Sequence, residues 1–454
     1  MLKILNNVKV YFITPPKLLF KSSILILTLL SICQCSKEVV IPNQIEIEAY
    51  DIKVNLDLNN LLNLNAKLEI LKKDSIDKFE LLLSSEAKIE SIKSKIKNDW
   101  IDISYTRNKD TLVLTIPSEI VSNRELIIEF NYTFPTGEIK DVLYFDRGHR
   151  WYPLIIDQIA RFKLTAEVPF EYEVFSVGDL ISRKKLNEYS QFIWESKIPV
   201  FKLPIIIAKT GYYQKTYKEC NSKEIYFYSL IKNKEIIEEI LSEACNTMKF
   251  FNEHIGEYHH NQLTIIEFPE FQGTNIATSL LIIGSQLFDF FKKGYYENLH
   301  FSIACQWIAA GTFNKLFGKG FWFLQISLPH YLRLMYLRQT KEEDAYIKAL
   351  QKGLVAYKEI ANSDKDVPLI DIDFPDSPEK GKIIYGKGPY IIDQVCIQIG
   401  EKNWEKLIKD IYKDFKGRIF NYNDFISYLS KYDEDGTCVP KFEKMLSERG
   451  IPDN

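Results

Sequence analysis

The sequence has almost no excess of charge of either sign. Its 58 Lys and Arg residues nearly balance its 61 Asp and Glu residues, so the formal net charge is −3 over 454 residues. The two signs are interspersed, and no basic stripe, nucleotide-binding loop or internal repeat occurs. A polyanion needs a concentrated basic surface to bind. We therefore expect no nucleic-acid partner.

Cysteine is also scarce, and its number argues against a disulfide framework. Beyond residue 35 the count is five, which is odd, and the five are scattered: Cys220, Cys245, Cys305, Cys396 and Cys438. A small disulfide-stapled domain would show an even number at regular spacing. At most one pair, such as Cys220 and Cys245, could bridge, and the sequence leaves that open.

The amino terminus contains an apolar segment that is too short to span a bilayer. It reads SSILILTLLSI, lies between Lys21 and Cys33, and has about the length of a signal-peptide core. Lysines precede it, and no acidic residue occurs before Glu38. This pattern predicts export.

A cysteine that closes such a segment resembles a bacterial lipobox, in which the thiol is acylated after cleavage. Cys33 and Cys35 both qualify, although each lacks the usual small residue before it. Ser36 and Lys37 look like the start of a tether and favour Cys35. The alternative is an ordinary secretory signal. The resemblance implies a lipid-anchored protein of a bacterial cell envelope, on the periplasmic or the outer surface.

The mature chain of about 420 residues is long enough for two domains. From about residue 45 to 205, apolar and polar residues alternate, as in EIEAYDIKVNL (46–56), TLVLTI (111–116) and ELIIEFNY (125–132). This period-two pattern predicts an antiparallel sandwich or saddle. After a strand near 205–211, apolar residues recur at helical spacing from Lys234 to Glu253, and QLTIIEF (262–268) predicts another strand.

The stretch from His300 to Leu328 resembles the zinc-binding core of the aminopeptidase N family of gluzincin metallopeptidases. That family has the pattern H-E-x-x-H-Q-W followed by W-L-N-E-G, and Gln306-Trp307 sets the register here. Counting back places the family's first histidine at Phe301, its glutamate at Ser302 and its second histidine at Cys305. Counting eighteen residues forward, 306 to 323, places its third ligand at Leu324.

The resemblance implies a zinc site whose chemistry has been replaced. Residues i and i+4 of a helix lie on one face, so two histidines there can hold zinc, and a glutamate completes the set. Phe301 and Leu324 have no ligand atoms, and Ser302 cannot act as a general base. We therefore expect the protein to bind no metal or other cofactor. If it is instead a working enzyme with a metal site that these motifs do not reveal, the metal is expected to be zinc.

Three nearby residues were weighed as substitute ligands. His300 is five residues from Cys305, about 140° around a helix, so the two do not converge. Gln325 would take the third position if the loop held one extra residue, although a neutral amide is a poor zinc ligand. His330 is expected to face elsewhere. Both histidines are interpreted as helix-end or surface residues.

Two further positions of the resemblance lie outside this core. FQGTN (271–275) corresponds to the family's G-x-M-E-N strand, whose glutamate binds a peptide's free amine; Thr274 takes its place, and Glu270 lies out of register. IYGKGP (384–389) resembles the family's Y-x-K-G, whose tyrosine donates to the oxyanion. Tyr385 retains that position, which also fits a turn and helix start.

These observations predict an α+β protein, with an amino-terminal antiparallel β-sandwich or saddle packed on a thermolysin-like α+β domain. The expected organisation is a signal peptide at 1–35, a tether at 36–44, a β domain at 45–205, a degenerate gluzincin domain at 206–436 and a tail at 437–454. The favoured function is a non-catalytic lipoprotein that binds a peptide or protein in the inherited cleft. The alternative is a working zinc aminopeptidase.

Overall fold

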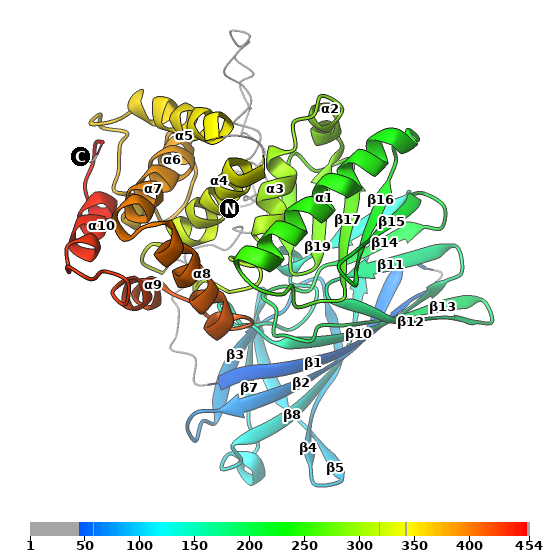
Figure 1. Ribbon diagram of the computed structural model, residues 1–454. Coiled ribbons are helices and arrows are strands. Elements are labelled where there is room, and N and C mark those ends of the chain that lie inside the picture. Colours follow the sequence, from blue (N-terminus) through cyan, green and yellow to red (C-terminus); the bar gives the residue numbers. More distant parts are fainter. Residues whose placement is uncertain (1–44, 58, 317, 341–342, 452–454) are drawn as a thin grey trace.

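The chain forms a β-rich amino-terminal part and a carboxy-terminal part dominated by helices (Figure 1). The computed structural model describes residues 45–57, 59–316, 318–340 and 343–451. The α+β class expected from the sequence is confirmed. The candidate signal peptide and its Cys33 and Cys35 lie outside the described residues.

The first part is built around an eight-stranded sheet. In β1 (Ile45–Leu56), buried and exposed residues alternate along the strand, because one face packs on the core and the other meets solvent. Most neighbours are antiparallel as expected, but β1 pairs with β10 in parallel. The strand order is β12 (Asp179–Leu186), β13 (Tyr189–Glu195), β10 (Arg161–Pro169), β1, β2 (Leu61–Lys72), β8 (Glu125–Pro135), β4 (Lys88–Ile96) and β5 (Asp99–Asp102).

Two three-stranded sheets complete this part. One is ordered β3 (Lys78–Leu82), β7 (Thr111–Thr115), β6 (Ser104–Asn108), and the other β11 (Tyr172–Ser176), β14 (Ile205–Lys209), β9 (Val142–Phe145). The strand expected near 205–211 is therefore β14, and it lies in the middle of its sheet. Phe201 and Lys202 lie in the short segment before β14, which leads toward the second part.

The second part begins with a five-stranded mixed sheet that helix α1 (Lys234–His254) covers (Figure 1). The order is β15 (Gln214–Cys220), β16 (Lys223–Ser229), β17 (Gln262–Phe268), β19 (Leu280–Gly284) and β18 (Thr274–Ala277). All seven residues of β17 are buried, as expected for a strand with both faces covered. A disulfide joins Cys220 at the end of β15 to Cys245 of α1, which settles the pairing that the sequence left open.

Helices form the remainder of the described chain. They are α2 (Phe288–Phe291), α3 (Glu297–Ala304), α4 (Leu328–Thr340), α5 (Glu343–Lys358), α6 (Pro378–Lys382), α7 (Gly388–Ile399), α8 (Glu401–Phe415), α9 (Tyr422–Leu429) and α10 (Cys438–Ser447), with π-helical turns η7 (Phe323–Ser327) and η9 (Ile383–Lys387). The segment suggested as a tail thus contains α10, whose buried Phe442 packs against Phe323 and Phe425. In the part of the chain that the structure describes, no helix is long and apolar enough to cross a membrane.

Buried hydrogen bonds join the two parts beside α3. The Ser279 hydroxyl accepts from the Gly178 amide at 2.6 Å and donates to the Gly178 carbonyl at 3.1 Å. Gln306, which is fully buried, accepts from the Ser279 amide at 2.7 Å and donates to the Ala277 carbonyl at 3.0 Å. The Trp307 indole donates to the Gly256 carbonyl at 2.7 Å. The Gln306-Trp307 dipeptide therefore fixes the end of α3 against the sheet.

Candidate functional site

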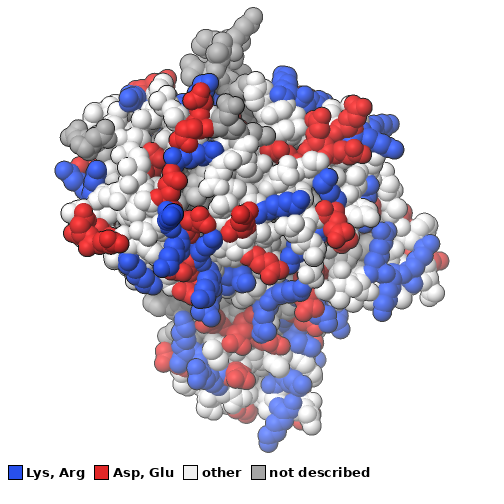
Figure 2. Space-filling model, in the orientation of Figure 1, with Lys and Arg blue, Asp and Glu red and all other residues white. Residues whose placement is uncertain are grey.

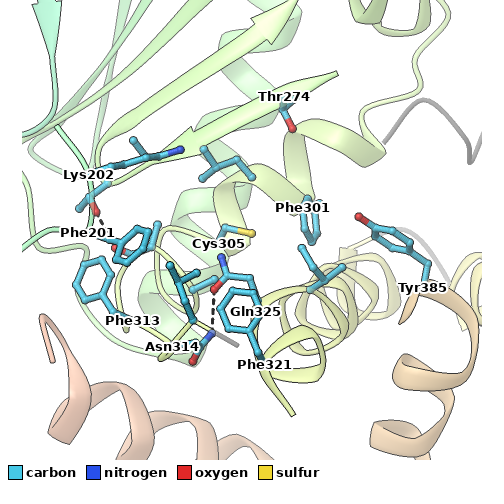
Figure 3. Close-up of a pocket in the computed structure, with 17 residues that line it drawn as sticks. Phe201, Lys202, Thr274, Phe301, Cys305, Phe313, Asn314, Phe321, Gln325 and Tyr385 are labelled. Atoms are coloured by element: carbon cyan, nitrogen blue, oxygen red, sulfur yellow. Dashed lines mark hydrogen bonds between the residues drawn. The ribbon is translucent and has the colours of Figure 1, made fainter. Parts of the chain in front are cut away.

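A pocket lies where the segment before β14, strand β18, helix α3 and the turns η7 and η9 meet (Figure 3). It encloses about 840 Å³ of empty space, part of it open to solvent. Its wall is mostly apolar, which is usual for small-molecule sites. The lining residues are Phe201, Lys202, Thr274, Ile276, Ala277, Thr278, Phe301, Cys305, Ala309, Ala310, Phe313, Asn314, Leu316, Phe321, Gln325, Ile326 and Tyr385.

Phe301 of helix α3 and Cys305, one helical turn later, both point toward the pocket. Both side chains line the wall and both residues are buried. Burial raises the pKa of the Cys305 thiol, so the sulfur is a neutral, apolar part of the wall. Ser302 is fully buried on another side of the helix, where its hydroxyl donates to the Asn298 carbonyl at 2.7 Å. It does not line the pocket.

The third expected position is occupied by Gln325, and Leu324 points elsewhere. Leu324 is buried in the helical core and is not part of the pocket wall, whereas Gln325 lines it. The Gln325 side-chain oxygen accepts from the Asn314 amide at 3.0 Å (Figure 3). The segment is the π-helical turn η7, which holds one residue more per turn than an α-helix. The residue count from Cys305 names Leu324, whereas the residue of this segment that lines the pocket is the next one, Gln325.

Thr274 and Tyr385 both reach the pocket from opposite elements. Thr274 begins β18, while Glu270 is exposed in the turn before it and contributes nothing to the wall. Tyr385 lies in η9 and points its hydroxyl toward Phe301 (Figure 3). That hydroxyl is buried and has no hydrogen-bond partner among the described residues. Burial raises the pKa of Tyr385, so it stays a neutral donor.

His300 is buried within α3, so its interpretation as a surface or helix-end residue was wrong, whereas His330 is half-buried in the first turn of α4. The His300 Nε2 atom lies 2.7 Å from a Glu243 carboxylate oxygen, and Tyr336 donates to the same oxygen at 3.1 Å. The His330 ring lies 6.2 Å from the Phe301 ring and 5.5 Å from the Tyr385 ring, behind the residues that line the pocket.

The His330 imidazole is neutral. Burial, with the Arg333 charge nearby, lowers its pKa well below the usual range. Its Nε2 accepts from the Arg333 guanidinium at 3.2 Å, which requires an unprotonated nitrogen. His330 packs behind the wall without lining the pocket. Arg333 lies three residues along the same helix, whereas the Glu243 partner of His300 lies 57 residues earlier in the chain.

Lys202 is the charged residue of the pocket wall, and no motif in the sequence points to it. It is buried, lines the wall, and extends toward the middle of the cavity (Figure 3). Its ammonium donates to the Asn275 side-chain oxygen. Asn275 donates to the Tyr144 hydroxyl at 2.8 Å, and Tyr144 donates to Asp146 at 2.8 Å. The one available signal was a lysine inside the apolar run VFKLPIII (200–207).

The electrostatics of Lys202 follow from that position. Burial lowers its pKa to about 8, and the negative charge of Asp146 limits the fall. The lysine is therefore mostly cationic at neutral pH. Among the described residues no Asp or Glu lines the pocket, and the other ionisable lining groups, Cys305 and Tyr385, are neutral.

The residues that line the pocket do not fit a zinc ion. Zinc in proteins is held by three or four Cys, His, Asp or Glu side chains. Phe301 offers no donor, Gln325 offers a neutral amide, and Cys305 is a single protonated thiol. Among the residues that the structure describes, no group of three or more His, Cys, Asp or Glu side chains is arranged to hold a metal. The arrangement presents an apolar cavity with a few polar groups at its edges.

Comparisons with known proteins place the fold. No protein-family model matches this sequence, and no curated protein does. An M1 zinc metallopeptidase variant from Deinococcus radiodurans bound to a Tyr-Ser-Ala substrate superposes with a TM-score of 0.71 at 11% identity, over 90% of this chain and 96% of that one. A two-domain M1 zinc metallopeptidase variant bound to L-arginine gives 0.71 at 11% identity, over 91% and 96%. The likeness to the fold of the aminopeptidase N family is confirmed, and at this identity it concerns the fold alone.

Proposed function

We propose that this chain is a non-catalytic binding protein, a pseudoenzyme on a zinc aminopeptidase fold, which holds a peptide or protein segment in the pocket described above. The observation that carries the proposal is the set of side chains at the three ligand positions. Phe301, Cys305 and Gln325 line one wall and form an apolar surface with one amide. Such a wall can contact an apolar side chain of a ligand, and it supplies no group that activates water.

Two features support a peptide as the ligand. The structural neighbours are described as complexes with a Tyr-Ser-Ala substrate or with free amino acids, and the pocket here lies within the same fold. The pocket also keeps polar groups that suit a peptide backbone, namely the Tyr385 hydroxyl and the Asn314 side-chain oxygen, both without a protein partner among the described residues. Buried polar groups of this kind favour a ligand that satisfies them.

Metal analysis and an activity assay test the proposal directly. We expect the purified protein to contain no stoichiometric zinc and to release no product from aminoacyl reporter substrates, with or without added zinc. Because a real zinc site binds tightly, about one zinc per chain that a chelator removes together with activity would establish the alternative, a working zinc aminopeptidase.

We further propose that the protein is anchored in a bacterial cell envelope by acylation of Cys35 or, failing that, Cys33, and faces the periplasm or the outside. Several acyl chains give a stable anchor, whereas a single chain holds only weakly. We therefore expect membrane association that resists high salt. Mass spectrometry of the mature amino terminus decides the matter, because an unmodified residue after simple signal cleavage would rule the anchor out.

A nucleic-acid partner is not part of this proposal. On the face shown in Figure 2, Lys and Arg side chains alternate with Asp and Glu side chains, and no extended basic area stands out. A phosphate backbone needs clustered positive charge. A filter-binding assay with DNA and RNA at 150 mM salt, taken as about physiological, is expected to show no retention.

A further inference from the structure

The polar groups of the pocket wall are distributed unevenly. Lys202 is the charged lining residue, and it comes from the segment before β14 in the amino-terminal part. The wall opposite consists of Phe301, Cys305 and their apolar neighbours, with Tyr385 beyond them (Figure 3). A molecule that fills this cavity therefore meets one cation on one side and apolar surface on the other.

The Lys202 ammonium is incompletely compensated by the protein. Moving an ammonium out of water is costly unless an anion and hydrogen bonds replace the lost hydration. Its hydrogen-bond acceptor among the described residues is the neutral amide oxygen of Asn275. The nearest acid in that network, Asp146, is separated from Lys202 by Asn275 and Tyr144. An ammonium has three donors, so it can still bind an acceptor in the pocket.

Asp146 is committed to other donors. Its carboxylate accepts from the Tyr144 hydroxyl at 2.8 Å and from the Gly148 amide at 2.9 Å, and it lies 3.0 Å from His149 Nδ1. These contacts hold Asp146 in place behind the wall, where it moderates the pKa of Lys202 from a distance. The ammonium is thereby kept cationic near neutral pH while its open side faces the cavity.

We propose that the pocket binds an apolar carboxylate, with the carboxylate on Lys202 and the apolar group against Phe301, Cys305 and Phe321. For a peptide, this means capture through the free carboxyl terminus with an apolar last residue. The proposal rests on the proposed binding function and names the chemistry of its ligand. The Tyr385 hydroxyl and the Asn314 side-chain oxygen, both buried and without a partner among the described residues, supply a donor and an acceptor for the ligand's amide groups.

Calorimetry with matched probes tests the proposal. The first pair is N-acetyl-leucyl-phenylalanine and its carboxamide, and the second pair is decanoate and decanol. We expect each acid to bind at least about tenfold more tightly than its neutral partner, because a hydrogen bond to a charged group is stronger than a neutral one. Lys202→Met should remove that preference. Lys209→Met, at the exposed end of β14, is the matched control and should keep it.

The outcomes separate this inference from the proposed function. Equal binding of the peptide acid and its amide, or an acid preference that survives Lys202→Met, overturns the carboxylate site while peptide binding stands. Binding of decanoate but of neither peptide, with the Lys202 dependence intact, overturns the peptide as ligand and supports the carboxylate site. If no acid binds, the inference fails. Should Lys202→Met not fold, Lys202→Gln keeps a neutral donor for Asn275 and serves in its place.

Discussion

Helix α3 is buried from Leu299 to its end, and two of its faces there have opposite chemistry. Toward the pocket it presents Phe301 and Cys305, which carry no charge. On the other face His300 meets the Glu243 carboxylate of α1 at 2.7 Å. The helix can therefore bury a polar side chain where the core supplies a partner. The histidine of this helix, His300, thus pairs with a carboxylate in the core. The face on which metal ligands would be expected is apolar.

The largest effect is expected when the His300–Glu243 contact on the polar face is removed. Glu243→Ala leaves the His300 ring and the Tyr336 hydroxyl without this acceptor in the core. We expect the free energy of unfolding to fall by about 3 kcal/mol, since both groups lose a buried charged acceptor. Urea denaturation measures it. As a control, Glu238→Ala at an exposed position of α1, the helix that carries Glu243, should change the free energy of unfolding by less than about 0.5 kcal/mol. Equal losses in both variants would contradict the pairing.

The second test converts the apolar face. Phe301→His, Cys305→His and Gln325→Glu together should create a three-ligand zinc site, because these three side chains line one pocket. Zinc at a hundredfold excess over its Kd should then add about 2.7 kcal/mol to stability, and it should leave the parent unchanged. Thermal unfolding with and without zinc measures this.

The matched control replaces Gln325→Glu by Leu324→Glu in the same background. Leu324 lies in the helical core, so a carboxylate there would be buried away from the pocket and should give no zinc response. A zinc response in the Leu324 variant alone would show that the spacing from Cys305 gives the facing residue after all. The comparison thus decides between the two registers.

The sequence predicted the fold because its signals are local. Period-two alternation in residues such as those of β1 fixes a half-buried strand, and helical spacing fixes α1, which begins at Lys234 as expected. The Gln306-Trp307 register also placed Phe301 and Cys305 on one helix face, and both line the pocket. These inferences needed no knowledge of distant contacts.

The remaining features depend on non-local geometry. That Gln325 lines the pocket and Leu324 does not depends on the path of the chain between Cys305 and η7, which a residue count does not give. The burial of His300 depends on Glu243, 57 residues earlier in the chain. Lys202 is a single lysine in an apolar run, and its place in the pocket depends on how β14 joins the two parts. Such pairings become visible only in three dimensions.

The third test measures how protein stability depends on pH through Lys202, the charged side of the pocket. Because burial lowers the folded-state pKa of Lys202 to about 8, the unfolded chain holds this proton more tightly. Stability of the ligand-free protein should therefore rise between pH 8 and pH 10.5, the ordinary lysine pKa, relative to Lys202→Met. The difference should be on the order of 2 kcal/mol. The charged groups that act on Lys202 are Asp146 and Arg147.

Urea denaturation of both proteins across that range measures the third prediction. Lys209→Met serves as the control, because Lys209 is exposed and does not line the pocket. Carboxylate binding should respond in the opposite direction, weakening as Lys202 loses its proton. A stability difference that falls as pH rises would contradict the assigned environment.

The smallest effect is expected at Cys305, on the apolar face. A thiol that served a metal or acted as a nucleophile would be a thiolate near neutral pH. Burial raises the pKa of Cys305 instead, so its reaction with iodoacetamide should be negligible at pH 8 in the native protein and rapid in urea. Peptide mass spectrometry after labelling measures this, with Cys305→Ala to identify the modified peptide. Cys396 and Cys438 are buried as well and serve as internal references. Fast native labelling at Cys305 alone would show that this face of α3 is reactive and would remove the contrast between the two faces of the helix.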